Sequence, residues 1–511
     1  MLATVIIASL TDPQAYPYPV ERIEVIETHI SWVFLAGDRV YKVKKPVDLG
    51  FLDFTTLERL RFYCTEEVRL NQRLTDDVYL GVVELNGRER VRIGGPGPTR
   101  EVAVEMRRLP HDRMLDVLVR EGRAEPALLE DIGRILARFH EAASGGGEID
   151  MFGGVETIRT NWKENFEQTT PFGADVLPGE WRSDMQRWVS DFTEREAARF
   201  AARVDAGRIR DCHGDLQAQH VCCTDPIQIF DCIEFNHRFR YGDVAGELAF
   251  LMMDLDRLER ADLALRFLNA YLEESGDYEA VPLLDFYRAY RAYVRGKVLG
   301  FMIPGRPDAA AKARERFALA HRYTRAERVP RLLVTTGVVG SGKSTVGHSV
   351  AARLGAIVVR TDAVRKRLAG VRPTTRRASS FGEGLYTPEI GRQTYTEALR
   401  QARKLLQAGW AVLIDGTFST AAERQQAREL ASDLGRPFAI LWCDAPDAVL
   451  DIRLRQRAAD IRQVSDAGPE LLAAHRARYE PPDGESETIR VDTTAGPDAV
   501  VAAALRALSR A

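Results

Sequence analysis

Residues 337–344 have the sequence Gly-Val-Val-Gly-Ser-Gly-Lys-Ser, directly after an apolar segment at 332–336 and directly before a helical segment at 345–354. A glycine-rich turn between a strand and a helix lets successive backbone N–H groups point at phosphate oxygens. The lysine of this motif reaches the β- and γ-phosphates of a nucleotide, and the following serine offers its hydroxyl to Mg²⁺. The residues predicted to bind ATP here are Gly337, Gly340, Ser341, Gly342, Lys343, Ser344 and Thr345.

The segments around this loop alternate between strand-like and helix-like patterns from about residue 330 onward. Apolar strand-like stretches occur at 332–336, 357–361, 412–415 and 438–443. Strands that alternate with helices predict a parallel sheet with helices on both faces. We therefore predict one α/β domain over residues 326–511.

Two carboxylates follow strands of this predicted sheet, at the edge where such sheets bind ligands. Asp362 is placed to accept a proton from a substrate hydroxyl, and Arg365 to hold an anionic group. The alternative for Asp362 is the N-cap of the helix that follows. Asp415 ends an apolar strand and is suited to hold Mg²⁺ opposite Ser344.

A group of arginines lies near the end of this domain, at Arg453, Arg457 and Arg462. Their spacing of four and five residues favours a lid that closes over the transferred phosphoryl group and neutralises its charge. The alternative is an exposed, solvated helix face. The region from Arg331 to about Tyr479 resembles small-metabolite P-loop kinases, including zeta-toxin-like and polynucleotide-kinase-like members with Asp-x-x-Arg after the second strand.

A second informative stretch has the sequence His-Gly-Asp-Leu-Gln-Ala-Gln-His at 213–220, followed by Ile-Phe-Asp at 229–231. Phosphorylation of a hydroxyl needs one group to accept the substrate proton and further groups to hold a metal ion on the ATP phosphates. The spacing predicts Asp215 as the base, with His220 and Asp231 as metal ligands.

This stretch resembles the catalytic loop of the aminoglycoside phosphotransferase family, relatives of the protein kinases. The family has Asn where this chain has His220, and imidazole suits Mg²⁺ less well than an amide oxygen, so Mn²⁺ is the alternative ion at this site. The resemblance implies an ATP-binding lysine on the third strand, for which we favour Lys42 over Lys44. It implies a partner glutamate in the next helix, for which we favour Glu67 over Glu66.

The resemblance also implies that Tyr241-Gly242-Asp243 braces the catalytic loop. The family's glycine-rich loop has no counterpart beyond Gly37 in a predicted hairpin turn between 31–35 and 40–43. An acidic segment around Glu234, Asn236 and Asp254 indicates either recognition of a cationic or polyhydroxylated acceptor or surface carboxylates on solvated helices.

The whole chain resembles a bacterial two-domain family labelled bifunctional aminoglycoside phosphotransferase/ATP-binding protein or AAA-family ATPase. This implies an α+β, protein-kinase-like bilobal domain followed by an α/β P-loop kinase domain with a parallel sheet. The boundaries that we expect are 1–110 for the N-lobe, 111–325 for the helical C-lobe and 326–511 for the P-loop domain.

Composition excludes several classes of protein. Apolar residues make up 45% and charged residues 28% of the 511 residues, which is typical of a globular chain and not of a fibrous or disordered one. The six cysteines have no C-x-x-C spacing, so we expect no disulfide framework or zinc site and a reducing, cytoplasmic location. The apolar start at 2–10 is too short to span a membrane and predicts a buried helix or strand.

Charge separates the two halves of the chain. Residues 329–511 hold 26 Lys and Arg against 20 Asp and Glu, a net +6, whereas the rest holds 45 against 54, a net −9. A basic excess suits phosphate-rich ligands or nucleic acid. Few aromatic residues accompany these cations, which argues against base stacking. No heptad seam is present, so the sequence makes no prediction of oligomeric state.

The sequence favours an ATP-dependent phosphotransferase that acts on hydroxyl groups of a small molecule, with two candidate sites for ATP and Mg²⁺. One alternative is a single catalytic half with the other half as a nucleotide-sensing regulatory module. The other is a 5′-hydroxyl nucleic-acid kinase that uses the C-terminal domain.

Overall fold

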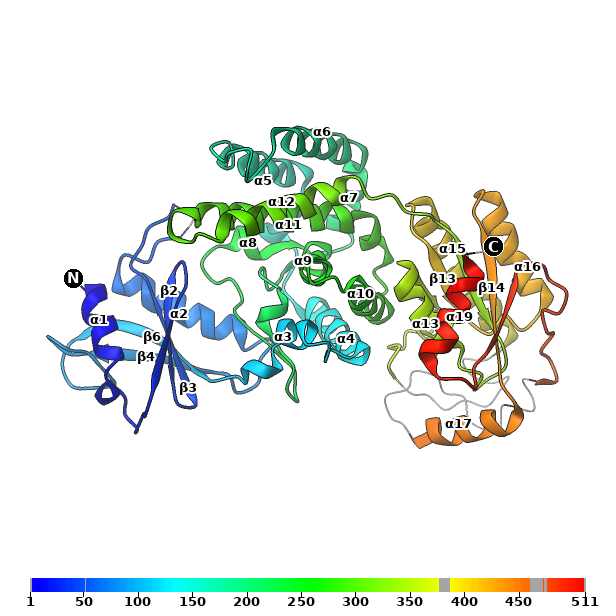
Figure 1. The fold of residues 1–511 in the computed structure, drawn as a ribbon, viewed down its shortest axis with the longest axis horizontal. Helices are drawn as coiled ribbons and strands as arrows, with labels where there is room; N and C mark the ends of the chain where they lie inside the picture. Colours follow the sequence, from blue (N-terminus) through cyan, green and yellow to red (C-terminus); the bar gives the residue numbers. More distant parts are fainter. Residues whose placement is uncertain (1, 51, 376–386, 460–471, 473–475, 510–511) are drawn as a thin grey trace. The chain divides into compact units, whose positions relative to one another are not determined.

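A computed structural model describes residues 2–50, 52–375, 387–459, 472 and 476–509 (Figure 1). The chain forms two compact units. The first comprises Met1–Ala124, Ala142–Asp254 and Tyr290–Ala320, and the second comprises Glu125–Glu141, Leu255–Ala289 and His321–Ala511. The domain boundaries expected from the sequence stay predictions.

The first unit contains, in the part of the chain that is described, a six-stranded antiparallel sheet with the order β1-β2-β3-β6-β4-β5. Its hairpin between β2 and β3 turns at Gly37 and Asp38, and Gly37 takes the left-handed φ of 65° that such a turn requires. This confirms the predicted hairpin. The strands are β1 (Ile23–Glu27), β2 (Ser31–Ala36), β3 (Arg39–Lys44), β4 (Tyr79–Asn86), β5 (Arg92–Ile93) and β6 (Thr99–Arg107).

Helices cover both faces of this sheet. Successive strand residues point to opposite sides, so each face presents apolar side chains that a helix buries. Helix α1 (Leu2–Leu10) buries Ile6 and Leu10 against Phe34 and Tyr41. The apolar start of the chain is therefore a helix. On the other face, α2 (Leu57–Asn71) begins after its N-cap Thr56 and packs against β4 and β6, as Figure 1 shows.

The rest of the first unit is mainly helical, and helices α9, α11 and α12 contribute residues to both units. Its elements are α3 (Leu115–Arg120), α5 (Val155–Gln168), α6 (Gly179–Arg195), α7 (Ala197–Asp205), β7 (Ile209–Asp211), η4 (Ala218–His220), β8 (Val221–Cys222), β9 (Gln228–Ile229), α8 (His237–Arg240), β10 (Tyr241–Asp243), α9 (Val244–Arg257), α11 (Leu284–Phe301) and α12 (Ala309–Thr324). The strands β7 and β10 pair with each other on either side of the catalytic-loop segment.

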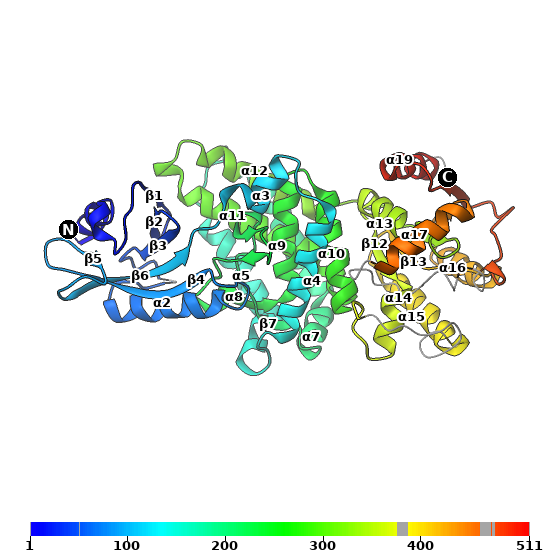
Figure 2. The same ribbon diagram turned by 90° about the horizontal axis from the view of Figure 1, so that it is seen from below.

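The second unit is built on a parallel sheet, five-stranded over the described residues, with the order β12-β13-β11-β14-β15. This confirms the predicted α/β domain. Helices α13 and α19 bury their apolar residues on one face of the sheet, and α15 and α16 cover the other (Figure 2). The strands are β11 (Leu332–Thr336), β12 (Ile357–Arg360), β13 (Val412–Asp415), β14 (Phe438–Asp444) and β15 (Thr488–Asp492).

The helices of this unit include segments from two parts of the chain. After residue 320 they are α13 (Lys343–Leu354), α14 (Thr361–Leu368), α15 (Pro388–Gln407), α16 (Ala421–Asp433), α17 (Asp447–Ala459) and α19 (Pro497–Leu508). Helices α4 (Pro126–Ala142) and α10 (Ala261–Ser275) and the short helix η5 (Tyr278–Leu283), from the region expected to be the helical C-lobe, also fall in this unit. In the described ranges no helix is both long and apolar enough to cross a membrane.

Candidate active site

The segment from His213 to Asp215 is held in place by a buried carboxylate. Glu247 on α9 accepts the backbone N–H groups of His213 and Gly214 at 2.8 and 2.7 Å. Gly214 has a φ of 89°, and a Cβ there would lie 2.9 Å from the carbonyl oxygen of Phe239. Glycine is therefore required at this position. The sequence analysis missed Glu247.

The expected brace from Tyr241-Gly242-Asp243 acts through the backbone. These residues form β10, which pairs with β7 directly before the catalytic loop. The Asp243 carboxylate pairs instead with the buried Arg203 at 2.6 and 3.0 Å. The bracing role of this strand stays a prediction, whereas the carboxylate that accepts hydrogen bonds from the loop backbone belongs to Glu247.

The structure brings the predicted residues Asp215, His220 and Asp231 together. His220 Nδ1 lies 2.8 Å from the backbone oxygen of Asp215, and its Nε2 lies 3.5 Å from Asp231 Oδ2. Because Nδ1 faces that carbonyl, Nε2 is the ring nitrogen that faces Asp231. Gln219 Nε2 contacts the same nitrogen at 3.2 Å, and Gln217 Nε2 donates to Asp215 Oδ1 at 2.8 Å.

Asp231 is held in a conformation that non-glycine residues rarely adopt. Its φ is 64°, and its backbone N–H donates to the hydroxyl of Tyr79 at 3.2 Å. Strain of this kind is concentrated at functional sites. Burial raises the pKa of Asp231, but the charges of Lys42 and His220 outweigh burial and bring the pKa well below its ordinary value. The carboxylate is therefore ionised and suited to a cation.

Lys42 and Lys44 form a buried chain of charges with Glu67. Lys42 Nζ lies 2.8 Å from Glu67 Oε1 and 2.5 Å from Asp231 Oδ1, whereas Lys44 Nζ lies 2.5 Å from Glu67 Oε2. Lys44 also pairs with Glu234. Of the two lysines, Lys42 contacts the predicted metal ligand, while Lys44 is completely buried beneath it.

The acidic segment after Asp231 has a structural position. Glu234 is buried against Lys44, and Asp254 is buried and accepts the N–H of Ala218 at 3.0 Å. Burial shows that the solvated-helix alternative is wrong for these two carboxylates, whereas the acceptor-recognition expectation stays a prediction. Glu66, the alternative to Glu67, pairs with Arg69 on the surface of α2.

The glycine-rich loop of the second unit has the backbone that its sequence requires. Gly337, Gly340 and Gly342 have φ values of 137°, 82° and 84°, and Gly342 is the N-cap of α13. A Cβ on Gly337 would lie 2.3 Å from the carbonyl oxygen of Cys443. Lys343 Nζ donates to the Val338 carbonyl at 2.8 Å. The loop is thus a cradle of backbone N–H groups at a helix N-terminus, suited to phosphate.

Asp415 lies at the end of β13, beside this loop and almost fully buried. Its Oδ2 has no hydrogen-bond partner among the described residues, although His348 Nε2 and Arg360 Nε lie 3.5 and 3.6 Å away. Burial raises the pKa of Asp415, but His348, Arg360 and Ser344 outweigh burial and lower it. An ionised, buried oxygen without a partner, close to a serine hydroxyl, fits a divalent cation. The sequence analysis missed His348 and Arg360.

Asp362 and Arg365 form an ion pair on α14. Arg365 Nη1 donates to Asp362 Oδ1 at 3.1 Å, and Lys366 Nζ lies 3.8 Å from Oδ2. The N-cap of α14 is Arg360, so Asp362 lies within the first turn, and the N-cap alternative is wrong. The proposed roles of base and anion-binding residue stay predictions.

The arginines expected to form a lid lie on α17 and beyond. Arg453 donates to the Oγ1 and backbone oxygen of Thr493 at 2.9 and 2.5 Å, beside the glycine-rich loop. The side chain of Arg457 and all of Arg462 lie outside the described residues. Thr345 is exposed on the first turn of α13.

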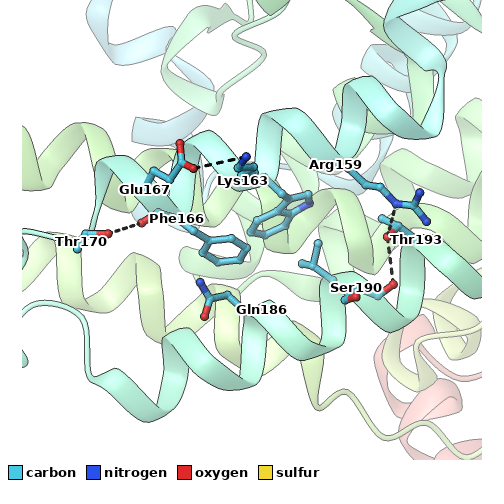
Figure 3. A pocket seen from close by; sticks show the side chains of 10 residues that line it. Arg159, Lys163, Phe166, Glu167, Thr170, Gln186, Ser190 and Thr193 are labelled. Carbon is cyan, nitrogen blue, oxygen red and sulfur yellow. Dashed lines mark hydrogen bonds and ion pairs between the residues drawn. The ribbon is translucent and has the colours of Figure 1, made fainter.

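A separate groove of about 430 Å³ lies between α5 and α6 of the first unit (Figure 3). Its apolar part includes Trp162, which stacks on Phe166 with ring centroids 5.3 Å apart. Its charged residues have partners, since Lys163 pairs with Glu167 and Arg159 with Glu156. The residues that line it include none of the described residues predicted for catalysis.

Comparison with known proteins matches two family models to separate parts of the sequence. A family model described as "Phosphotransferase enzyme family" (APH) matches residues 92–284, and one described as "AAA domain" matches residues 332–482. Uncharacterized proteins of Mycobacterium tuberculosis strain H37Rv and of Mycobacterium bovis are 37% identical to this chain over 458 residues, which cover 89% of this chain and 90% of theirs.

Among solved structures, a gluconokinase from Sinorhizobium meliloti is 24% identical, with a TM-score of 0.26, and the match covers 36% of this chain and 94% of that one. A choline/ethanolamine kinase family protein from Mesorhizobium loti is 14% identical, with a TM-score of 0.41, covering 64% of this chain and 96% of that one.

Proposed function

This chain belongs to the bacterial two-domain family that joins an aminoglycoside-phosphotransferase-like region to a P-loop region, and on this premise we propose that it phosphorylates hydroxyl groups of a small molecule at two ATP sites. One observation supports the proposal above the others. Each unit holds an ionised carboxylate next to a cation, Asp231 with Lys42 and Asp415 with Arg360, and the second unit also holds the backbone cradle of residues 337–344.

In the first unit, Asp215 is the proposed base. Gln217 holds its Oδ1, which leaves Oδ2 to accept the proton of the substrate hydroxyl as that oxygen attacks the γ-phosphorus. Lys42 turns from Asp231 to the α- and β-phosphates, and Glu67 keeps hold of its Nζ and so limits the motion. Catalysis then rests on positioning and on neutralisation of phosphate charge.

In the second unit, Lys343 is the proposed phosphate-binding cation. It exchanges the Val338 carbonyl for the β- and γ-phosphates, and the N–H groups of residues 337–344 bind the remaining oxygens. Asp362 accepts the proton of the acceptor, and Arg365, its ion-pair partner, turns to an anionic group of that molecule. Arg453 stands beside the loop to neutralise phosphoryl charge.

The metal ligands that we propose are His220 and Asp231 in the first unit, and Ser344 and Asp415 in the second. A divalent cation at these positions supplies charge neutralisation of the ATP phosphates. Mg²⁺ is proposed for the oxygen ligands of the second unit. Because one ligand of the first unit is an imidazole nitrogen, Mn²⁺ is proposed there beside Mg²⁺.

The test is ADP formation by the wild type and by the variants Asp215→Asn and Lys343→Ala, with Mg²⁺ and Mn²⁺ in parallel. The acceptors are sugars, aminocyclitols, nucleosides and oligonucleotides with a 5′-hydroxyl. The exposed ion pair of Asp308, directly before α12, and Lys312 on α12 offers matched controls, Asp308→Asn and Lys312→Ala. We expect each active-site substitution to remove a different acceptor-dependent activity and the controls to remove none.

Other outcomes decide between the alternatives. If Lys343→Ala loses all turnover and Asp215→Asn keeps wild-type turnover, the first unit is a nucleotide-sensing module. Turnover only with 5′-hydroxyl oligonucleotides would favour a nucleic-acid kinase. Turnover that survives both substitutions would contradict both proposed sites.

A further inference from the structure

Helix α10 contacts the outer edge of the parallel sheet of the second unit. Among the described residues β12 is an edge strand, so in that part of the chain the outward N–H and C=O groups of Val358 have no neighbouring strand. Asn269 on α10 fills this role, since its Oδ1 accepts the Val358 N–H at 2.9 Å and its Nδ2 donates to the Ala356 carbonyl at 3.2 Å. The hydroxyl of Tyr278 donates to the Val358 carbonyl at 3.1 Å. The edge is thus fixed to α10 by side chains.

One turn further along the same face of α10, Glu273 contacts the end of this strand. Its Oε1 accepts a hydrogen bond from Arg360 Nη1 at 3.1 Å, and both side chains are nearly buried, at 11% and 12% exposed. Residues four apart lie on one helix face, so Asn269 sets the position of Glu273 relative to β12. Arg367 of α14 also donates to the backbone carbonyl of Glu273 at 2.7 Å. Glu273 is therefore held from two sides.

The guanidinium of Arg360 lies between two carboxylates. It makes a hydrogen bond to Glu273, but its Nε stays 3.6 Å from Asp415 Oδ2, longer than a hydrogen bond. In this almost buried environment a lone guanidinium would close onto Asp415, because an ion pair with a short hydrogen bond is much stronger there than in water. Glu273 supplies the competing negative charge.

We propose that Glu273 is a positioning residue for the P-loop site, which holds Arg360 away from Asp415 and so leaves Asp415 Oδ2 available to a divalent cation. This inference rests on the proposed function of that site. It also means that the second site depends on a helix that lies outside the P-loop segment of the sequence.

The test is direct binding of Mn²⁺, followed by electron paramagnetic resonance, to the full-length chain in the presence of the ATP analogue AMP-PNP. An Asp231→Asn background removes the carboxylate of the two metal ligands that we propose in the first unit, His220 and Asp231. We expect Glu273→Gln to raise the dissociation constant of Mn²⁺ by about 10- to 100-fold, the usual effect of a residue that orients a metal ligand. Binding of AMP-PNP without metal should not change.

Two further variants separate positioning from folding. Glu279 is an exposed carboxylate on η5 that pairs with Lys404, and Glu279→Gln is the matched control, with no change expected. In the double variant Glu273→Gln/Arg360→Gln the guanidinium that would close onto Asp415 is gone. We expect its dissociation constant for Mn²⁺ to lie within about threefold of that of Arg360→Gln alone. A double-mutant cycle measures this coupling between Glu273 and Arg360.

Unchanged Mn²⁺ binding in Glu273→Gln would overturn the inference, as would weakened binding that removal of Arg360 does not restore. If Glu273→Gln does not fold, Arg360→Gln alone tests the inference. We expect Arg360→Gln to bind Mn²⁺ at least as tightly as the background protein. Tenfold weaker binding would refute the inference. If the background protein binds no Mn²⁺ with AMP-PNP, or if Lys343→Ala leaves that binding intact, the proposed P-loop site fails and this inference fails with it.

Discussion

Replacement of Lys44 by methionine isolates the buried charge pair beneath the first site. Lys44 is completely buried, and its ammonium is shared by Glu67 and Glu234, which are buried as well. Methionine has a similar length but no charge, so the variant leaves Glu234 without a cation. Breaking a buried ion pair in this way costs about 3–5 kcal/mol of folding free energy. The equilibrium constant for opening of this region is therefore about 10²- to 10⁴-fold larger than in the wild type.

The loss of folding free energy in Lys44→Met should depend on pH. Burial raises the pKa of Glu234 above its ordinary value, and without the Lys44 ammonium this pKa rises further in the folded chain. The folded variant then holds a proton that the unfolded chain releases above about pH 4.3. Folded stability is therefore retained at low pH and lost as pH rises towards the folded pKa. We expect a larger deficit at pH 8 than at pH 5.

The assay is hydrogen–deuterium exchange with mass spectrometry, which follows peptides of α2 and β3 apart from those of the second unit. Lys42→Met is the comparison, because Glu67 then keeps Lys44 as its partner and the Asp231 side chain is 39% exposed. We expect this variant to lose at most half as much folding free energy as Lys44→Met. The exposed pair of Lys312 and Asp308 makes Lys312→Met a control with no expected change. Two results would refute the reasoning. One is hydrogen exchange at the wild-type rate in Lys44→Met, and the other is a greater loss of folding free energy in Lys42→Met than in Lys44→Met.

Three further predictions concern single positions. His220→Asn replaces the imidazole by an amide oxygen donor, so the ratio of Mg²⁺- to Mn²⁺-supported turnover of the first site should rise about tenfold, and an unchanged ratio would remove His220 from the ligand set. Gly337→Ala places a Cβ 2.3 Å from the Cys443 carbonyl oxygen, so fluorescent ATP binding to the second unit should be lost; normal affinity would show that the loop can shift. Burial raises the pKa of Glu101 to about 7, so this carboxyl favours folding below about pH 4.5 and loses that contribution as pH rises to 7. Glu101→Gln should be more stable than wild type at pH 8, by up to about 3 kcal/mol, in urea unfolding followed at both pH values, and equal stability would contradict it.

Sequence patterns predicted the parts of both sites that are continuous in the chain. The glycine-rich loop at 337–344 was found because glycines with positive φ, a lysine and a serine must stand at fixed spacing for a backbone to surround phosphate. The same holds for Asp215 and His220, which meet through the one turn of η4. Local geometry is encoded in local spacing, so it can be recognised without the fold.

The supporting charges could not be predicted because their partners are far away in sequence. Lys44 meets Glu234 across 190 residues, and Arg360 meets Glu273 across 87. Any buried carboxylate of a helix could serve such a role, and periodicity shows only that a residue faces inward. For Glu234 the alternative of a solvated carboxylate assumed exposure, and the burial of this side chain shows that it was wrong. Only tertiary packing determines which cation a buried carboxylate meets.

Both sites solve the same electrostatic problem by similar means. A cation near a metal-binding carboxylate lowers the pKa of that carboxyl and so keeps it ionised, but the same cation competes with the metal ion. Lys42 supplies that cation to Asp231 and Arg360 supplies it to Asp415. A cation that bound the ligand alone would block it, but each is shared with a second buried carboxylate, Glu67 or Glu273. Since the second carboxylate can keep the cation when the ion binds, the ligand is released without leaving a buried charge unpaired. Loss of either second carboxylate should therefore weaken metal binding at its own site and leave the other site unchanged.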